Sequence, residues 1–331
     1  MGLGFKVSTK KKVNMIISDH VIRYLDASKP ELDEIKSFGE KFIPSGIIEE
    51  GKIIDKERFL LLLQECVKEW KLKGNQVQFL VPDPFIVVRK IEIPGDIHDE
   101  EIKGYLFLEL GSTIHLPFEN PVFNYEVLGI QEGRKEILLF AAPEVVVQDY
   151  TQLFIQAGLE PIVADISPLA IYRLYYKLFE PQEDGIPILS LQFNLQTVTA
   201  SIFVNHKLIF VRQLKMNVAL DQWNIAQDGS EEKLIWNGDD NYLLFEIQEM
   251  VEEVERIINF YQYSLNKNGG DGISQILLTG DHPHLTDIKV NLEQSLETDI
   301  ITLTKHSRLG KNLADQTSYY LLAGLALKGG V

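Results

Sequence analysis

The stretch ILSLQFNLQTVTASIFVNHKLIFVRQL, residues 188–214, decides the fold class. Three apolar runs in it predict consecutive β-strands, at 188–193, 197–204 and 207–214. The pair Asn205-His206 predicts a tight hairpin turn between the last two strands. A similar but shorter run, MIISDHVIRYL at 15–25, predicts a strand or a turned strand pair near the start of the chain. Two β-rich starts, each followed by helix-bearing segments, predict a duplicated α/β protein with two lobes.

Residues 85–166 lie between these two starts and predict a unit of their own. The expected order is strand, helix, strand, strand, helix, strand, at 85–93, 100–112, 122–130, 136–141, 144–157 and 162–166. We expect this α+β unit to be inserted into the first lobe. The predicted division is a basic tail (1–13), the N-terminal part of the first lobe (14–84), the inserted subdomain (85–166), and the rest of the first lobe with the second lobe (167–331).

Helices are predicted in the remaining parts of both lobes, at 56–71, 168–179, 242–266, 285–296 and 318–327. In the longest of them, a stripe from Leu244 through Ile247 and Val251 is expected to face the core. The glutamates off that stripe, from Glu246 to Glu255, are expected to form a solvated face. Residues 217–241 are polar and predict a mobile segment.

Composition excludes several classes of protein. The 331 residues include 32 Lys+Arg and 48 Asp+Glu, a net charge of −16, which argues against a dedicated nucleic-acid binder. A single cysteine, Cys66, excludes an internal disulfide and a cysteine-based zinc site. No uncharged apolar run reaches the ~18 residues of a membrane-spanning helix. We therefore expect a cytosolic protein.

Few residues suggest catalysis or metal binding. No Ser-His-Asp arrangement, Walker-type glycine loop or dinucleotide fingerprint occurs. His282 and His284 have a spacing that two metal ligands could use, but no third ligand is placed by the sequence, so a polar turn is the favoured interpretation. Cys66 lies on the apolar face of the predicted helix 56–71 and is expected to pack in the core.

Six segments, in order along the chain, resemble the type IV pilus assembly protein PilM family, which belongs with the cell-division protein FtsA in the actin-like superfamily. They are PSGIIEEGKIID (44–55), HLPFENPVFNYEVLG (115–129), AGLEPIVADI (157–166), EVERIINFYQ (253–262), ILLTGD (276–281) and LLAGLALKG (321–329). The resemblance implies an actin-like fold with a nucleotide cleft between its two lobes. Residues 85–166 would then be the small subdomain of the FtsA type.

The family's nucleotide motifs are altered in this chain. The first phosphate loop, Asp-Ile-Gly-Ser in relatives, corresponds to Ile16, Ile17, Ser18 and Asp19, with Arg23 near the family's lysine. The second loop, Asp-Ile-Gly, corresponds to Gln192, Phe193 and Asn194, and the Gly-Gly pair of the adenosine motif to Gly280 and Asp281. Both carboxylates that would position hydrated Mg²⁺ are therefore missing, and Asp19 and Asp281 are expected to repel a triphosphate.

These changes predict a degenerate cleft, with no metal, no catalytic residue and no enzymatic activity, in which ATP with Mg²⁺ is disfavoured. Each missing charge-assisted contact is worth roughly 1.5–3 kcal/mol. The alternative is an active actin-like ATPase that cycles its lobes in pilus or cell-division assembly. A membrane-polymerising FtsA-like protein and a sugar kinase rank lower, because the sequence lacks the membrane helix and the catalytic aspartate they need.

By resemblance, the protein is expected to be a cytoplasmic scaffold of the pilus inner-membrane platform. The expected partners are the cytoplasmic N-terminal tail of a PilN-like single-pass membrane protein and other platform proteins, and not nucleic acid. Residues expected to line the groove for this tail are Phe85, Val87, Glu101 and Leu108. The basic N-terminus could add a weak attraction to an anionic membrane surface, about 1 kcal/mol per basic residue.

Overall fold

The computed structural model describes residues 11–27, 29–181, 186–228, 231–266, 272–304, 306–309, 313–314 and 316–329. Most of the predicted basic tail, residues 1–10, lies outside the described residues, and Lys12 and Val13 already belong to the first strand. In the described ranges, no helix has both the length and the apolarity needed to cross a membrane.

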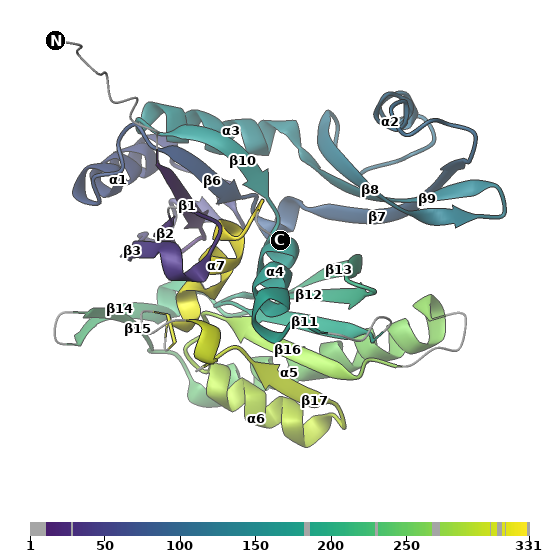
Figure 1. Ribbon diagram of the computed structural model, residues 1–331. Helices are drawn as coiled ribbons and strands as arrows, with labels where there is room; N and C mark the ends of the chain where they lie inside the picture. The colour runs from purple at the N-terminus through teal and green to yellow at the C-terminus, as the bar shows by residue number, and fades with distance from the viewer. Residues whose placement is uncertain are drawn as a thin grey trace, which may run out of the picture.

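Two five-stranded sheets of the same topology form the two lobes (Figure 1). The first contains β1 (Lys12–Ile17), β2 (Val21–Ala27), β3 (Ile35–Phe42), β6 (Gln76–Leu80) and β10 (Glu160–Asp165). The second contains β11 (Ile188–Phe193), β12 (Thr197–Val204), β13 (Lys207–Lys215), β16 (Gln275–Gly280) and β17 (Asp299–Thr302). In each sheet an antiparallel meander of three strands is extended by two parallel strands beside its first strand. The predicted duplication is thus present in the strand order.

Two helices lie between the sheets and hold the lobes together. These are α4 (Ser167–Phe179) and α7 (Tyr320–Ala326), which pack on each other (Figure 1). Their apolar side chains join residues of both sheets in one buried cluster, with Leu25 from β2 and Leu277 from β16 fully buried in it. Because this cluster draws on both lobes, the central helices are the shared core of the molecule.

The outer face of each sheet is covered by its own pair of helices. On the first lobe these are α1 (Lys56–Glu69) and α3 (Glu144–Gln156), and on the second α5 (Asp240–Phe260) and α6 (Leu285–Ser295). Helix α1 begins where the carboxylate of Asp55 accepts a hydrogen bond from the backbone N–H of Arg58. Cys66 is buried on its inner face, as predicted, and burial raises the pKa of this thiol to about 12. Two short hairpins complete the lobes: β4 (Ile48–Glu49) with β5 (Lys52–Ile53), and β14 (Trp223–Asp228) with β15 (Glu231–Trp236).

The inserted subdomain projects from the first lobe as a separate sheet (Figure 1). It consists of β7 (Val87–Pro94), α2 (Ile102–Glu109), β8 (Pro121–Gln131) and β9 (Arg134–Pro143), with strand order β7-β9-β8 and a small core of its own. The predicted unit 85–166 also included α3 and β10. Strand pairing places β10 beside β6 in the first sheet, and α3 packs in the core of the first lobe. The pairing therefore favours a boundary near residue 143, and the division into domains stays a prediction.

Two local predictions are wrong, and one hairpin was not predicted. Phe85 lies in a short 3-10 turn (Asp83–Phe85) rather than in the strand, which starts at Val87. Segment 217–241, predicted only as polar and mobile, contains the β14–β15 hairpin, in which Trp223 pairs with Trp236. In α5, Leu244 is exposed whereas Glu246 is buried, because the Glu246 carboxylate accepts a hydrogen bond from the backbone N–H of Asn217.

Two helical glycines give opposite expectations for substitution. A Cβ at Gly324 in α7 would lie 2.0 Å from the backbone oxygen of Ala170 in α4, whereas at Gly104 in α2 it would meet nothing within 4 Å. We expect Gly324→Ala to lower the free energy of unfolding by about 1–3 kcal/mol through overpacking. Gly104→Ala should raise it by about 0.5–1 kcal/mol, because alanine loses less backbone entropy in a helix.

Urea unfolding midpoints of the two variants measure this difference. Equal midpoints for Gly324→Ala and the unaltered protein would contradict the close approach of α7 to α4.

Candidate functional site

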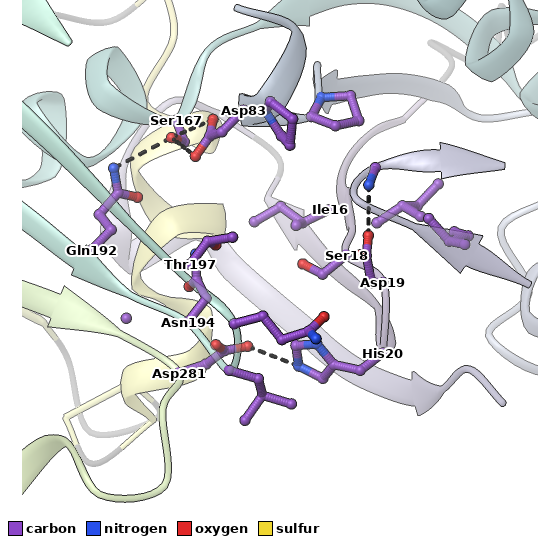
Figure 2. A pocket seen from close by; sticks show the side chains of 18 of the residues that line it. Ile16, Ser18, Asp19, His20, Asp83, Ser167, Gln192, Asn194, Thr197 and Asp281 are labelled. Carbon is purple, nitrogen blue, oxygen red and sulfur yellow. Dashed lines mark hydrogen bonds and ion pairs between the residues drawn. The ribbon is translucent and has the colours of Figure 1, made fainter. Parts of the chain in front are cut away.

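A cleft of about 650 Å³ lies between the two lobes. All seven positions predicted from the nucleotide motifs line it: Ile16, Ser18, Asp19, Gln192, Asn194, Gly280 and Asp281. Figure 2 labels all of them except Gly280 and shows Ser18 and Asp19 contributed by the first lobe and Asn194 and Asp281 by the second. The seven positions, chosen from separate motifs in the sequence, therefore lie around one cleft in the structure.

The two predicted phosphate loops are equivalent hairpin turns. The backbone N–H of Ser18 donates to the Val21 oxygen at 2.9 Å, and that of Asn194 donates to the Thr197 oxygen at 2.9 Å. Among the described non-glycine residues with positive φ, neither Ser18 nor Asn194 occurs. Both turns thus form without a glycine.

Ile16 and Gln192 lie at the two positions where the resemblance predicts the family's aspartates. Ile16 is 8% exposed and packs in the buried cluster shared by the lobes. Gln192 is 3% exposed, and its amide donates to the Ser167 hydroxyl at 3.3 Å. Neither side chain carries the anionic oxygen that a hydrated Mg²⁺ requires.

Asp19 supports a turn of the first lobe. Its carboxylate accepts hydrogen bonds from the backbone N–H groups of Glu50 at 2.6 Å and Gly51 at 2.8 Å, between β4 and β5. Glu50 and Gly51 both have positive φ, 50° and 74°, so this turn needs the anchoring. Burial raises the pKa of Asp19, although the two backbone donors oppose that shift.

Asp281 makes an ion-pair cluster across the cleft. Its Oδ2 lies 2.5 Å from Nη1 of Arg23 and 3.3 Å from Nε2 of His20, both from the first lobe. Figure 2 shows the side chains of His20 and Asp281 pointing toward each other. Burial alone would raise the pKa of Asp281, but the positive charge of Arg23 and the contact with His20 outweigh it and hold this pKa well below its ordinary range. Asp281 is therefore not the free carboxylate that the sequence suggested.

Glu40 on the neighbouring strand secures the arginine of this cluster. The Nε of Arg23 donates to Oε2 of Glu40 at 2.7 Å, and the two residues are direct partners in the β2–β3 pairing. Burial opposes the charge on Arg23, yet the carboxylates of Asp281 and Glu40 raise its pKa. The guanidinium thus pairs with two protein carboxylates, one through Nε and one through Nη1.

A second carboxylate in the cleft, Asp83, is half-buried and was not predicted from the sequence. It follows β6 and accepts hydrogen bonds from the hydroxyls of Ser167 at 2.7 Å and Thr199 at 2.8 Å. Thr199 belongs to the second lobe, so this contact also crosses between the lobes. Burial raises the pKa of Asp83, against the effect of the two hydroxyls. The Pro82-Asp83-Pro84 turn after a buried strand is the signal that could have identified it.

The charge of the cleft lining is mostly negative. Two strong cations line it, and both are paired: Arg23 with Asp281 and Glu40, and Lys215 with Glu50. Six carboxylates line the same cleft: Asp19, Glu49, Glu50, Asp83, Asp221 and Asp281.

The two histidines after Asp281 form part of an aromatic cluster. His282 is 3% exposed, and its ring packs edge-on against Trp223 at 5.5 Å between centroids. Burial lowers the pKa of His282 to about 4. In the described part of the chain, no group of three or more His, Cys, Asp or Glu side chains is arranged to hold a metal ion.

The four residues expected to line a partner groove lie at the inserted subdomain but are not gathered in one place. Phe85 and Val87 are half-buried at its root, where the chain leaves the first lobe. Glu101 and Leu108 are exposed on α2, with Leu108 at 75% and its neighbour Phe107 at 70%. Helix α2 therefore presents an uncovered apolar pair to solvent.

Two duplicated sheets, two helices shared between them, a cleft and an inserted subdomain define the actin-like fold. The chain is similar to the solved PilM-PilN type IV pilus biogenesis complex, with a TM-score of 0.74 and 18% identity over 96% of this chain and 98% of that one. It is also similar to ethanolamine utilization protein EutJ from Carboxydothermus hydrogenoformans, with a TM-score of 0.53 and 11% identity over 96% and 89% of the two chains. No curated protein sequence matches it. The sequence profile described as type IV pilus assembly protein PilM matches residues 15–330, so the chain belongs to the PilM family.

The Asp281 cluster gives a pH prediction. The pKa of Asp281 is lower in the folded protein than its ordinary value of 3.8, so the ion pair stabilises the fold above about pH 4 and this stabilisation is lost as the pH falls further. Asp281→Asn should therefore lower the free energy of unfolding by about 3 kcal/mol at pH 7. The difference in Tm from the unaltered protein should shrink below pH 4.

Thermal unfolding of both proteins between pH 3 and pH 7 provides the measurement. Asp287→Asn is the matched control, because Asp287 is an exposed carboxylate in the first turn of α6. A Tm difference for Asp281→Asn that stays constant down to pH 3 would show that the ion pair is not its source.

Proposed function

We propose that this protein is a cytoplasmic scaffold of the type IV pilus inner-membrane platform, which binds the cytoplasmic N-terminal tail of a PilN-like single-pass membrane protein. The observation that carries the proposal is the similarity over 96% of the chain to a structure described as a PilM-PilN complex. Membership of the PilM family supports the pilus role. In this proposal the protein reaches the inner face of the membrane through its partner, alongside other platform proteins.

The proposed docking site for the tail is the junction of the first lobe with the inserted subdomain, extended along α2. Exposed Leu108 and Phe107 offer apolar contact area, and half-buried Phe85 and Val87 are available at the root of the subdomain. Residues 96–109 carry five carboxylates, Asp96, Asp99, Glu100, Glu101 and Glu109, against one lysine, Lys103. This charge favours a tail that combines apolar anchors with basic residues.

The cleft is proposed to be non-catalytic, without bound ATP or Mg²⁺. The lining does not fit a magnesium-bound triphosphate, because Ile16 and Gln192 supply no carboxylate for the metal. Arg23 and Lys215 are both engaged by carboxylates, and further carboxylates line the same space. The alternative, an active actin-like ATPase, needs a cleft with free cations and metal-positioning groups.

Peptide binding tests the scaffold proposal. A synthetic peptide from the cytoplasmic end of a single-pass membrane protein encoded beside this gene should bind in calorimetry, and Leu108→Ser should weaken the binding about tenfold or more through loss of a buried anchor. Leu61→Ser is the matched control, because Leu61 is 62% exposed on α1, on the outer face of the first lobe. Failure of every such peptide to bind at high micromolar concentration would overturn the proposal.

Thermal unfolding with nucleotide tests the proposed inactivity of the cleft. Millimolar Mg-ATP should leave the Tm unchanged, because a ligand that does not bind the folded state cannot stabilise it. An increase of several degrees, together with phosphate release above background, would instead establish the ATPase alternative.

A further inference from the structure

The ion-pair cluster of Arg23, His20 and Asp281 is the feature whose role the scaffold proposal does not use. Asp281 follows the last residue of β16 in the second lobe, and Arg23 lies in β2 of the first lobe. The charged side chains of Arg23 and Asp281 are only 7% and 8% exposed, and that of His20 is 10% exposed. This deeply buried charged contact joins the two lobes, and its groups are 258 residues apart in the sequence. It lies in the lining of the same cleft as the two predicted phosphate loops.

This cluster is buried, whereas a second charged contact across the same cleft, between Lys215 and Glu50, is exposed. Lys215 and Glu50 also pair between the lobes, but their side chains are 60% and 65% exposed, and such surface pairs contribute little to stability. If the lobes moved apart, Arg23 and Asp281 would each lose their charged partner across the cleft, although Arg23 would keep Glu40. Breaking a buried pair carries a much larger penalty than breaking an exposed one.

We propose that Arg23, His20 and Asp281 form a clasp that keeps the two lobes closed with no ligand in the cleft. The Asp281 carboxylate acts as a built-in anion for the first lobe, and it engages the Arg23 guanidinium that an anionic ligand would otherwise need. Closure is then a fixed property of the folded chain rather than a response to a bound molecule.

Closure of the lobes also fixes the inserted subdomain. Lys207, at the β12–β13 turn of the second lobe, donates to the backbone oxygens of Val127 at 3.4 Å and Leu128 at 3.1 Å in β8. The strands β13 and β7 also lie in contact. Because the subdomain is attached to the first lobe by the chain and to the second by Lys207, the clasp holds all three parts in one arrangement.

Distances between spin labels on the two lobes test the clasp in the full-length protein. Lys68→Cys on α1 and Gln294→Cys on α6 place nitroxide labels at exposed positions of the outer helices. The native Cys66 can remain, because it is buried and its pKa of about 12 keeps the thiol unreactive. The labelled protein should show one narrow distance distribution that millimolar Mg-ATP does not change.

Neutralising the carboxylate should open the lobes. Asp281→Asn is expected to shift the distribution to longer distances and broaden it, and to accelerate amide exchange in β2 and at the end of β16 at least about tenfold. Lys215→Met, which removes the exposed contact across the same cleft, should leave both measurements as they are. If Asp281→Asn folds poorly, the double variant Arg23→Gln/Asp281→Asn carries the test, because it removes both charges of the buried pair and should show the same opening.

Two results would overturn the clasp. One is a distance distribution for the folded Asp281→Asn or double variant that matches the unaltered protein. The other is a distribution of the unaltered protein that is broad and becomes narrow only when Mg-ATP is added. Neither result depends on peptide binding, so the clasp and the scaffold proposal can fail separately.

Discussion

A charge removed from water is tolerated only beside a compensating charge, and Asp281 has its compensation on the opposite lobe. Arg23 supplies it, and Glu40 on the adjacent strand in turn holds Arg23 in position. The pairing of β2 with β3, the turn after β16 and the spacing of the two sheets are consequently linked through one guanidinium. The central helices α4 and α7 join the lobes by apolar packing, and the Arg23–Asp281 ion pair adds a charged contact between the lobes across the cleft.

Three aspartates that line the cleft make structural contacts, each with a different kind of partner. Asp19 anchors a turn with positive φ through backbone donors, Asp83 accepts from hydroxyls of a central helix and of the second lobe, and Asp281 pairs with the Arg23 guanidinium. The opposite pKa shifts of Asp83 and Asp281 reflect this difference, because only Asp281 has charged partners that outweigh burial. In all three cases the carboxylate is engaged by groups of the protein itself.

The sequence was informative where local patterns carry the structure. The three strands of 188–214 and the turn at Asn205-His206 are confirmed, because their apolar runs and turn residues depend only on neighbours in the chain. The β14–β15 hairpin escaped prediction since its strands mix Trp223 and Trp236 with polar residues. Glu246 looked solvated, yet it accepts a hydrogen bond from a residue 29 positions away. For the same reason the motifs located the cleft but not the partner of Asp281: no pattern within one loop indicates a contact between residues so far apart.

Gly280 is required by the packing of its own strand, independently of any nucleotide. Its φ is 127°, and a Cβ at this position would lie 1.9 Å from the backbone oxygen of Phe193 on the adjoining strand. Steric demands of the β11–β16 junction thus require a glycine whether or not a nucleotide is ever present. The presence of Gly280 is therefore explained by packing alone and carries no information about a nucleotide.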